Sequence, residues 1–392
     1  MVSDKTIQTL ISPSPSLPYL PVELIPGVLS RLPVKSLLQF RCVCKSWKSL
    51  ISDPNFAKKH LSLSTTHSIH CISYPSGHVL NPDKHVLKSY SLDSSVMTNQ
   101  TQFPQTTQLP LSRQCFVYFD GSCNGILCFS EVGRDYVLVR LWNPAIRKFK
   151  ELPSITEQQD INFGHSKLMS GFGYDPISDN YKAVFVLRGF KYVDYSRNYF
   201  CKNKVKVHTL GTNSWKSVSD FPFVGLSVLH SGQYVSGTIN WLVSTGTRQN
   251  AHFIASLGQC FIASFDLGKE SYQKVLLLDD YGEVDKYTLH LSVFRDCLCL
   301  ISGEDVWVMK EYGNKESWTK LFTISYLRDP RTSSYSYLGA TNVFEDGQVL
   351  LVCEGYDTWK YISYHCKNDT AKCIEFEITL EACIESLISP CF

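Results

Sequence analysis

One candidate for covalent chemistry is a cysteine flanked by glycines. Residues 121–125 read Gly-Ser-Cys-Asn-Gly, which has the spacing of a nucleophile elbow with cysteine at its centre. An elbow requires a strand, a sharp turn and then a helix, but residues 126–129 (Ile-Leu-Cys-Phe) continue the pattern of a strand. We therefore predict a β-turn here, in which glycine supplies a positive φ, and no catalytic residue.

Possible metal and cofactor sites are incomplete in the sequence. Residues 67–71, His-Ser-Ile-His-Cys, could supply two or three ligands, but zinc needs a fourth, and the pair His365-Cys366 is a weak candidate for it. Residues 171–176, Gly-Phe-Gly-Tyr-Asp-Pro, lack the third glycine and the following helix of a dinucleotide site. We predict strand and loop residues at 67–71, and neither a metal nor a cofactor.

The composition is that of a chain dominated by β-structure. Of 392 residues, 44% are hydrophobic, 13% are aromatic and only 19% are charged, which favours sheets. The fifteen cysteines are scattered without a CxxC pair, and many lie in apolar runs, as small buried hydrophobes do. The first 19 residues lack the features of a signal peptide, and every apolar run is far shorter than the ~20 residues that span a membrane. We expect a cytoplasmic or nuclear protein without a membrane partner.

Residues 20–61, here called the head, have a helical pattern and a basic charge. Apolar residues recur there at three- and four-residue steps, and seven Lys or Arg residues face only two acidic residues. Pro26 and Gly27 interrupt the first helical pattern; the proline is tolerated in the first turn if a helix begins at Val22 or Glu23, and otherwise kinks it. A unit of this size exposes more apolar surface than it can bury. We expect the surplus to contact a partner, for which the charge suits an acidic protein or nucleic acid.

Residues after the head are predicted to form strands. Residues 69–74 and 85–92 have strand patterns, and the polar run 94–108 is predicted to be a loop. From residue 115 onward a pattern of paired strands recurs five times. The outward strand of each copy ends near Trp142, His208, Phe265, Met309 and His365, at intervals of 66, 57, 44 and 56 residues. The later intervals approach the ~40–50 residues of a four-stranded propeller blade, which favours a β-propeller of about five to seven blades over a sandwich.

Several runs of residues carry a resemblance to a known family. The head resembles the F-box, through residues 20–24 (Leu-Pro-Val-Glu-Leu), 29–38, 40–47 and 52–56. The body, over residues 115–376, resembles the F-box-associated, kelch-related domain of a large plant family, through residues 121–125, 142–144 (Trp-Asn-Pro) and 171–176. The predicted organisation is a disordered tail (1–19), an F-box (20–62), a linker with the first strands (63–114) and a kelch-like propeller (115–392).

The resemblance implies a substrate receptor of an SCF-type (Skp, cullin, F-box) ubiquitin ligase. The head would bind a Skp-type adaptor, and through it a cullin and a RING subunit, while the body would recruit a protein client; no nucleic acid is expected. The residues that would face the adaptor are Leu20, Pro21, Leu24, Leu29, Leu32, Pro33, Leu37, Leu38, Val43 and Trp47. For Leu29, Val43 and Trp47, packing inside the head is an equal alternative.

The client site is sought in residues 188–199, which are rich in Tyr and Arg and long for a loop between strands. The candidate contacts are Arg188, Phe190, Tyr192, Tyr195 and Arg197, with disorder of this loop as the alternative. Most tryptophans of the body are expected in its core. Two other functions stay open: a scaffold that binds a protein or glycan without degradation, and a copper or radical enzyme on a kelch-like propeller, which would need a His/Tyr/Cys cluster at the centre.

Overall fold

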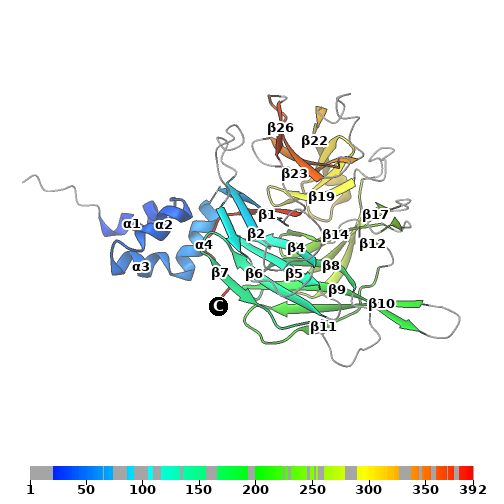
Figure 1. Ribbon diagram of the computed structural model, residues 1–392, viewed down its shortest axis with the longest axis horizontal. Coiled ribbons are helices and arrows are strands. Elements are labelled where there is room, and N and C mark those ends of the chain that lie inside the picture. Colours follow the sequence, from blue (N-terminus) through cyan, green and yellow to red (C-terminus); the bar gives the residue numbers. More distant parts are fainter. Residues whose placement is uncertain are drawn as a thin grey trace, which may run out of the picture.

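The computed structural model folds the chain into a small helical head and a six-bladed β-propeller (Figure 1). This confirms the predicted fold class, and six blades lie within the predicted range. The structure describes residues 21–64, 66–73, 86–91, 105–108, 116–132, 136–155, 166–192, 199–223, 226–227, 231–244, 248–250, 253–254, 260–278, 289–325, 337–343, 347–354, 359–368, 370–374 and 379–391. The predicted tail at residues 1–19, and Leu20, lie outside these ranges.

The described part of the head consists of short helices joined by tight turns. They are η1 (Val22–Leu24), α1 (Ile25–Leu29), α2 (Val34–Phe40), α3 (Lys45–Ile51) and α4 (Pro54–Leu63). Pro26 lies in the first turn of α1, where its missing N–H costs no hydrogen bond. The interrupted pattern at Pro26 and Gly27 thus reflects a change from a 3-10 turn to an α-helix at residue 25.

The propeller blades are antiparallel sheets, each built outward from an inner strand. Five of them each occupy one stretch of the chain: β4 (Phe116–Cys123), β5 (Ile126–Val132), β6 (Val137–Asn143) and β7 (Lys148–Glu151); β8 (Ser166–Asp175), β9 (Asn180–Tyr192), β10 (Tyr199–Thr209) and β11 (Lys216–Val218); β12 (Leu226–Ser227), β13 (Gln233–Val235), β14 (Thr238–Ser244), β17 (Cys260–Asp266) and β18 (Ser271–Val275); β19 (Leu289–Phe294), β20 (Cys297–Ser302), β21 (Asp305–Met309) and β22 (Trp318–Thr323); β23 (Tyr337–Val343), β24 (Gln348–Glu354), β25 (Trp359–His365) and β26 (Thr370–Ile374). Between β14 and β17, the short strands β15 (Arg248–Asn250) and β16 (Phe253–Ile254) pair with each other.

The remaining blade joins the two ends of the propeller. Its order is β27 (Thr379–Ile384), β1 (His67–Ser73), β2 (Val86–Ser91) and β3 (Gln105–Gln108), so a C-terminal strand pairs with the first strand after the head. Two strands of this blade match the predicted strand patterns at 69–74 and 85–92. The prediction of a loop over 94–108 is wrong for its last four residues, since β3 pairs with β2 there.

The sequence copies correspond to five of the six blades. Each of the five marker residues, Trp142, His208, Phe265, Met309 and His365, lies at the last or second-last position of the third strand of its blade. Hydrophobic clusters fill the spaces between neighbouring blades. The predicted core tryptophans Trp142, Trp241 and Trp318 are buried, whereas Trp215 and Trp307 are half-buried.

Two glycines of β8 show how closely neighbouring blades pack. A Cβ atom added at Gly171 would lie 2.3 Å from Ile239 Cγ2, and one added at Gly173 would lie 2.3 Å from Tyr234 Cδ2. Larger residues at either position would push the inner strand of the next blade away. This accounts for the Gly-Phe-Gly run that resembles part of a nucleotide-binding motif.

Candidate functional site

The head is attached to the propeller through α4. Asp53 caps this helix by accepting hydrogen bonds from the backbone N–H groups of Asn55 (2.8 Å) and Phe56 (3.0 Å). Phe56 and Ala57 are buried in one hydrophobic cluster with residues of β5, β6, β8 and β9. The head therefore packs over the joint between two blades rather than hanging on a flexible linker (Figure 1).

Polar contacts also fix the head against the propeller. Lys58 Nζ of α4 lies 2.6 Å from Asp179 Oδ1 in the β8–β9 turn, and the Tyr174 hydroxyl donates to the same carboxylate. Hydrogen bonds from Lys58 and Tyr174 hold the pKa of Asp179 below its ordinary value. Inside the head, His60 Nε2 donates to the carbonyl oxygen of Leu32 at 2.9 Å, which ties α4 to the segment after α1.

The segment that follows β27, residues 385–391, contacts both the head and the blade formed by β4 to β7. Asn143 at the end of β6 is buried, and its Nδ2 donates to the carbonyl oxygens of Ser386 (3.1 Å) and Ile388 (2.7 Å). Leu387 and Ile388 belong to the cluster shared with the head. We call residues 385–391 the C-terminal clasp, because these contacts link three parts of the fold.

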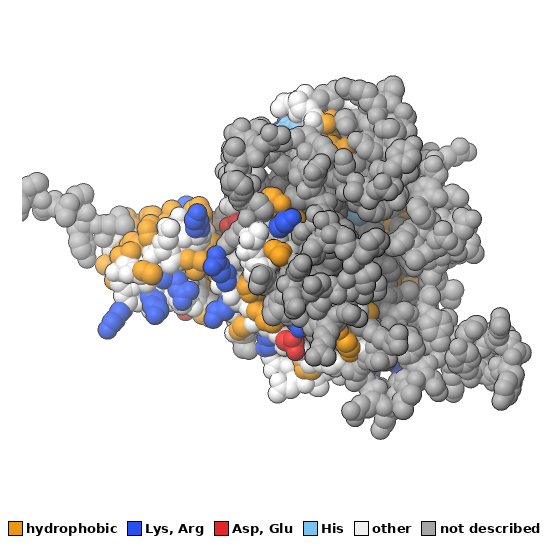
Figure 2. Space-filling model, viewed as in Figure 1, with side chains coloured by type: hydrophobic (Ala, Val, Ile, Leu, Met, Phe, Trp, Pro, Cys, Tyr) orange, Lys and Arg blue, Asp and Glu red, His pale blue; other side chains and the backbone are white. Residues whose placement is uncertain are grey.

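The opposite end of the head exposes apolar side chains. Val22, Leu24, Val28 and Val43 are exposed by 60%, 55%, 48% and 62%. Four Lys and Arg residues of the head are exposed as well: Arg31, Lys35, Lys45 and Lys48. Figure 2 shows hydrophobic and basic side chains side by side over the head. Such a surface, with apolar and basic side chains next to one another, is typical of a protein-binding site. We call this the apolar end of the head.

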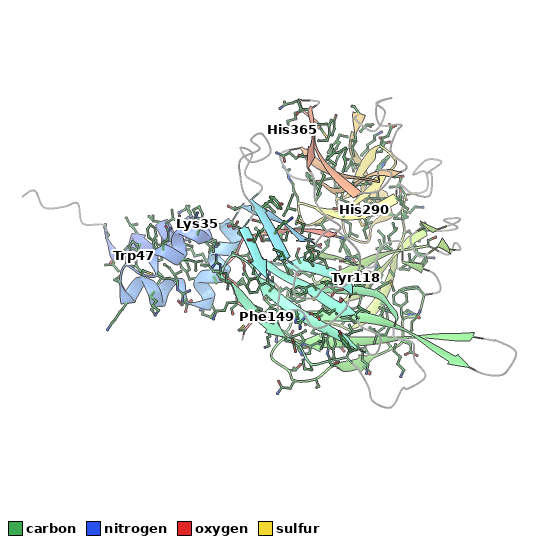
Figure 3. All side chains as sticks on the ribbon, in the orientation of Figure 1. Lys35, Trp47, Tyr118, Phe149, His290 and His365 are labelled. Atoms are coloured by element: carbon green, nitrogen blue, oxygen red, sulfur yellow. The ribbon has the colours of Figure 1, made fainter. Side chains whose placement is uncertain are left out.

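Most of the residues predicted to face an adaptor are exposed or half-buried in the structure. Pro21, Leu24, Pro33 and Val43 are exposed, and Leu32, Leu38 and Trp47 are half-buried. Trp47 packs edge-on against Phe40, with ring centroids 5.5 Å apart, among the helices of the head (Figure 3).

Two of the residues predicted to face an adaptor are buried inside the head, and for Leu29 such packing was the stated alternative. Leu29 and Leu37 are 2% and 0% exposed and form the core of the head with Val34 and Ile51. A partner could reach them only if the helices separated. Their packing instead fixes the positions of the helices that carry the exposed residues. For the exposed and half-buried residues, contact with an adaptor stays a prediction.

Sequence reasoning missed Val22 and Val28, which contribute to the apolar end. A signal for Val28 was available, because it follows Leu24 by four residues, and residues at this spacing share one helical face. Leu29 follows Ile25 by four residues and belongs to the other, inward face. Val22 has no comparable signal, because it precedes the α-helix in a 3-10 turn.

The glycine-flanked cysteine lies in a hairpin, as predicted. Strands β4 and β5 pair up to Cys123 and Ile126, and the turn between them has positive φ at Asn124 (53°) and Gly125 (82°). Cys123 is buried, and burial raises the pKa of its thiol. A buried neutral thiol is a poor nucleophile, and the residues after the turn form a strand instead of the helix of an elbow.

The histidines at 67–71 are residues of strand β1. His70 is buried, its Nδ1 lies 2.9 Å from Ser89 Oγ, and burial lowers its pKa to about 3. In the part of the chain that the structure describes, no three His, Cys, Asp or Glu side chains gather as a metal site. None of the helices described is long and apolar enough to cross a membrane.

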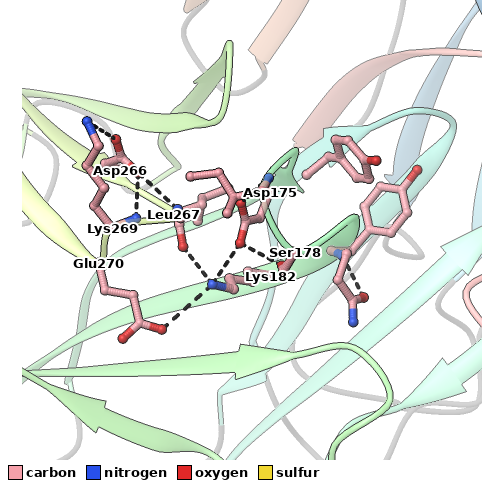
Figure 4. A network of polar contacts seen from close by, with 12 residues as sticks. Asp175, Ser178, Lys182, Asp266, Leu267, Lys269 and Glu270 are labelled. Atoms are coloured by element: carbon pink, nitrogen blue, oxygen red, sulfur yellow. Dashed lines mark hydrogen bonds and ion pairs between the residues drawn. The ribbon is translucent and has the colours of Figure 1, made fainter.

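A buried charged network between two blades is satisfied internally (Figure 4). Lys182 Nζ donates to the carbonyl oxygen of Leu267 at 2.6 Å and lies 3.0 Å from Asp175 Oδ2 and 3.7 Å from Glu270 Oε1. Although burial raises the pKa of Asp175, hydrogen bonds from Ser178 and Lys182 leave it below its ordinary value. The contacts of Lys182 with Leu267 and Glu270 connect two neighbouring blades.

The two ends of the predicted client loop are strand. Arg188, Phe190 and Tyr192 belong to β9, which pairs with β10 as far as Tyr192 and Tyr199. Tyr195 and Arg197 lie outside the described residues. The prediction of a long loop over 188–199 is therefore wrong for its two ends. The aromatic and basic residues at 188–192 belong to a strand that lengthens a hairpin of the blade.

Comparison with known proteins agrees with both parts of the chain. A model of the F-box domain matches residues 17–59, and a model of the F-box associated beta propeller domain matches residues 80–389. The F-box/kelch-repeat protein At3g23880 of Arabidopsis thaliana is 31% identical over 334 residues, which cover 83% of this chain and 84% of the relative. The F-box protein CPR1 of the same plant is 28% identical over 81% of this chain and 75% of its own length.

A third relative spans more of the chain. The F-box/LRR-repeat protein At2g43260 of Arabidopsis thaliana is 27% identical over 93% of this chain and 81% of its own length. Among solved structures, TolB from Acinetobacter baumannii matches 84% of this chain and 70% of its own, with 8% identity and a TM-score of 0.47. That likeness is too low to support an argument about the fold.

Proposed function

The chain belongs to the family of F-box proteins with an F-box associated beta propeller domain, and from this premise we propose that it is the substrate receptor of a Skp–cullin–F-box ubiquitin ligase. The head binds a Skp-type adaptor, and the propeller recruits a protein client. The chain performs no covalent step. It raises the effective concentration of a client lysine near the ubiquitin-loaded enzyme. We also propose that the protein acts in the cytoplasm or the nucleus, which are reducing compartments.

The observation that carries the proposal is the apolar end of the head. Val22, Leu24, Val28 and Val43 are exposed there although the core of the head is filled by other residues. Exposed apolar side chains in such a small area cost free energy in water, and a partner that covers them recovers it. The exposed basic residues of the head add attraction to an acidic adaptor and speed the encounter.

The attachment of the head leaves this surface free. Contacts between head and propeller use α4 and the C-terminal clasp, whereas the apolar end is formed by η1, α1 and the turn after α2. One partner at the apolar end and another on the propeller can therefore be bound together. Because the head and propeller share a core, the two partners would keep a fixed mutual position.

The test is an equilibrium titration of the purified chain with a Skp-type adaptor. We expect a 1:1 complex, and we expect Leu24→Asp and Val43→Asp each to weaken it by at least about tenfold, because a carboxylate replaces an apolar contact at the interface centre. Leu276→Asp is the matched control, since Leu276 is 50% exposed but lies on the propeller. Failure of the folded chain to bind the adaptor would refute the proposal.

A second comparison separates the surface from the core. Leu37→Ala should reduce the free energy of unfolding by about 2 to 5 kcal/mol, because Leu37 is fully buried. Leu24→Asp should leave that free energy almost unchanged. If both variants lost adaptor binding only in proportion to lost stability, the apolar end would not be the binding site.

A further inference from the structure

One strand closes the ring of blades. Strand β27 pairs with β1 and lies beside β4, the innermost strand of the next blade (Figure 1). The hydroxyl of Ser122 in β4 donates to the carbonyl oxygen of Ala382 in β27 at 3.0 Å, which ties the two blades together. The chain then continues from β27 into the C-terminal clasp. We call the contacts of β27 with β1 and β4 the closing seam, and they hold both the ring and the clasp in place.

Polar side chains from three strands meet in the closing seam. Glu381 of β27 is half-buried and lies directly opposite His70 of β1. Residues directly opposite in an antiparallel pair project from the same face of the sheet. From the neighbouring blade, Ser122 hydrogen-bonds to the Glu381 carboxyl group, and Asp120 is close enough for its charge to act on that group. A carboxyl group of the closing strand is thus placed beside a carboxyl group of the next blade.

The backbone of β4 directs Asp120 into this site. The register of β4 against β5 shifts between Phe119 and Gly121, so Asp120 is the extra residue of a β-bulge. A bulge changes the direction in which a side chain points. Asp120 is fully buried, and it accepts a hydrogen bond from the hydroxyl of Ser170 in β8 at 2.6 Å. The fold therefore gives this side chain little freedom to move away from Glu381.

Glu381 changes its charge near neutral pH. Burial raises the pKa of its carboxyl group to about 7, the charge of Asp120 adds to this effect, and the hydrogen bond from Ser122 opposes it. Below this pH the group is neutral and can donate a hydrogen bond to an oxygen atom. Above it, a second negative charge appears beside Asp120 in a place with little water, where like charges repel strongly. The ordinary pKa of 4.5 applies when the strand is open.

The other titratable groups around Glu381 do not compensate this charge. His70 stays neutral in this range, because burial lowers its pKa to about 3. Cys383 lies two residues further along β27 on the same face, and burial raises the pKa of its thiol. Glu385, just after β27, accepts a hydrogen bond from the hydroxyl of Ser68 at 2.8 Å. In the described part of the chain, no Lys or Arg residue acts on the Glu381 carboxyl group.

We propose that the closing seam is a proton-sensitive latch, in which a proton bound to Glu381 keeps β27 in place beside Asp120. When this proton is lost above neutral pH, repulsion between the two carboxylates loosens β27 and, with it, the C-terminal clasp. The stability that the proton contributes is complete below about pH 4.5 and is lost as pH rises through about 7. The attachment of the head to the propeller thereby depends on the pH of the compartment. This inference is independent of the proposed function, because the seam is part of the fold.

The experiment measures hydrogen exchange of the full chain at pH 6 and pH 8, for the unaltered protein and for Glu381→Gln. Glutamine has nearly the shape of the protonated acid and cannot ionise. From pH 6 to pH 8, the equilibrium constant for opening of β27 should rise about tenfold more in the unaltered chain than in the variant, as a pKa of about 7 against 4.5 requires. The pH dependence of exchange itself affects both proteins alike, so the comparison isolates Glu381.

Two further measurements locate the effect. The amides of β17, in the blade on the opposite side of the ring, should show no such difference, since the latch acts on β27 and its neighbours. Asp120→Asn, which removes one charge and keeps an acceptor for Ser170, should move the midpoint of the pH dependence to lower pH. A purely structural role of Glu381 would not produce this shift. Glu316→Gln, at an exposed turn of the propeller, is the control and should behave as the unaltered chain does.

Three results would overturn the inference. The first is an equal pH dependence of β27 opening in the unaltered chain and in Glu381→Gln. The second is an equal change in β17, which would show that the whole propeller responds instead of the seam. The third is an unmoved midpoint in Asp120→Asn, which would show that the two carboxyl groups do not interact.

Discussion

At the scale of single residues, neighbours in the head have opposite roles. Leu24 and Val28 are exposed on one side of the first helical segment, while Leu29 is buried on the other. The sequence could predict which residues are apolar and helical, but not which helical face would be covered. That choice depends on where α2 and α4 pack, and this packing is decided by contacts between residues distant in the chain.

Gly27 lies at a position where the fold has room for a larger side chain. A Cβ atom added there meets nothing within 4 Å, and the residue lies inside α1. Gly27→Ala should therefore raise the free energy of unfolding by about 0.5 to 1 kcal/mol, since alanine loses less backbone entropy in a helix. Chemical denaturation measures this change.

The matched control is Gly125→Ala. Gly125 has a φ of 82°, and an added Cβ would lie 2.4 Å from Ser386 Oγ. This variant should lower the free energy of unfolding, through both strain and a clash with the C-terminal clasp. Stabilisation by Gly125→Ala, or destabilisation by Gly27→Ala, would contradict the positions assigned to these two glycines.

His70 should make the stability depend on pH. Its pKa falls from an ordinary 6.5 to about 3 in the fold, so the unfolded chain binds a proton first as pH falls. The stability it contributes is complete above about pH 6.5 and is lost progressively toward pH 3. Between pH 7.5 and 5 the loss is about 2 kcal/mol.

Chemical denaturation at both pH values, for the unaltered chain and for His70→Asn, isolates this effect. Asparagine can keep a hydrogen bond to Ser89 but does not titrate. The unaltered chain should lose about 2 kcal/mol more than the variant on going to pH 5. An equal pH dependence would show that His70 can be solvated or paired when charged.

At the scale of elements, the C-terminal clasp is the least predictable part of the fold. Five blades could be predicted from recurring patterns, because the strands of each blade lie within one stretch of the chain. The sixth could not, since β27 is separated from β1, β2 and β3 by the rest of the propeller. Sequence alone shows the Trp-Asn-Pro run but not its role, because the backbone groups that Asn143 binds lie more than 240 residues further along the chain.

Asn143→Asp tests the clasp. The substitution replaces two donated hydrogen bonds by a carboxylate that faces the carbonyl oxygens of Ser386 and Ile388 in a buried site. We expect the free energy of unfolding to fall by about 3 kcal/mol or more. Asn213→Asp, at an exposed turn, is the matched control and should change it little. Equal effects of the two variants would contradict the stabilising role of the hydrogen bonds between Asn143 and the clasp.

At the scale of the whole molecule, the head and propeller form one unit with two separate surfaces. The resemblance to an F-box predicted an adaptor surface, and the structure locates exposed apolar residues at the end of the head that the propeller leaves uncovered. The client cannot be predicted in the same way, because propeller cores repeat while the segments at their rims differ from protein to protein.

Hydrogen exchange of the chain with and without a Skp-type adaptor tests the central claim most directly. Binding at the apolar end should slow exchange of backbone amides in residues 22–29 and 41–44, and leave the propeller blades unchanged. The exchange of α4 should change little, because its buried face already packs against the propeller. Protection confined to the propeller, or no protection in a folded chain, would contradict the account.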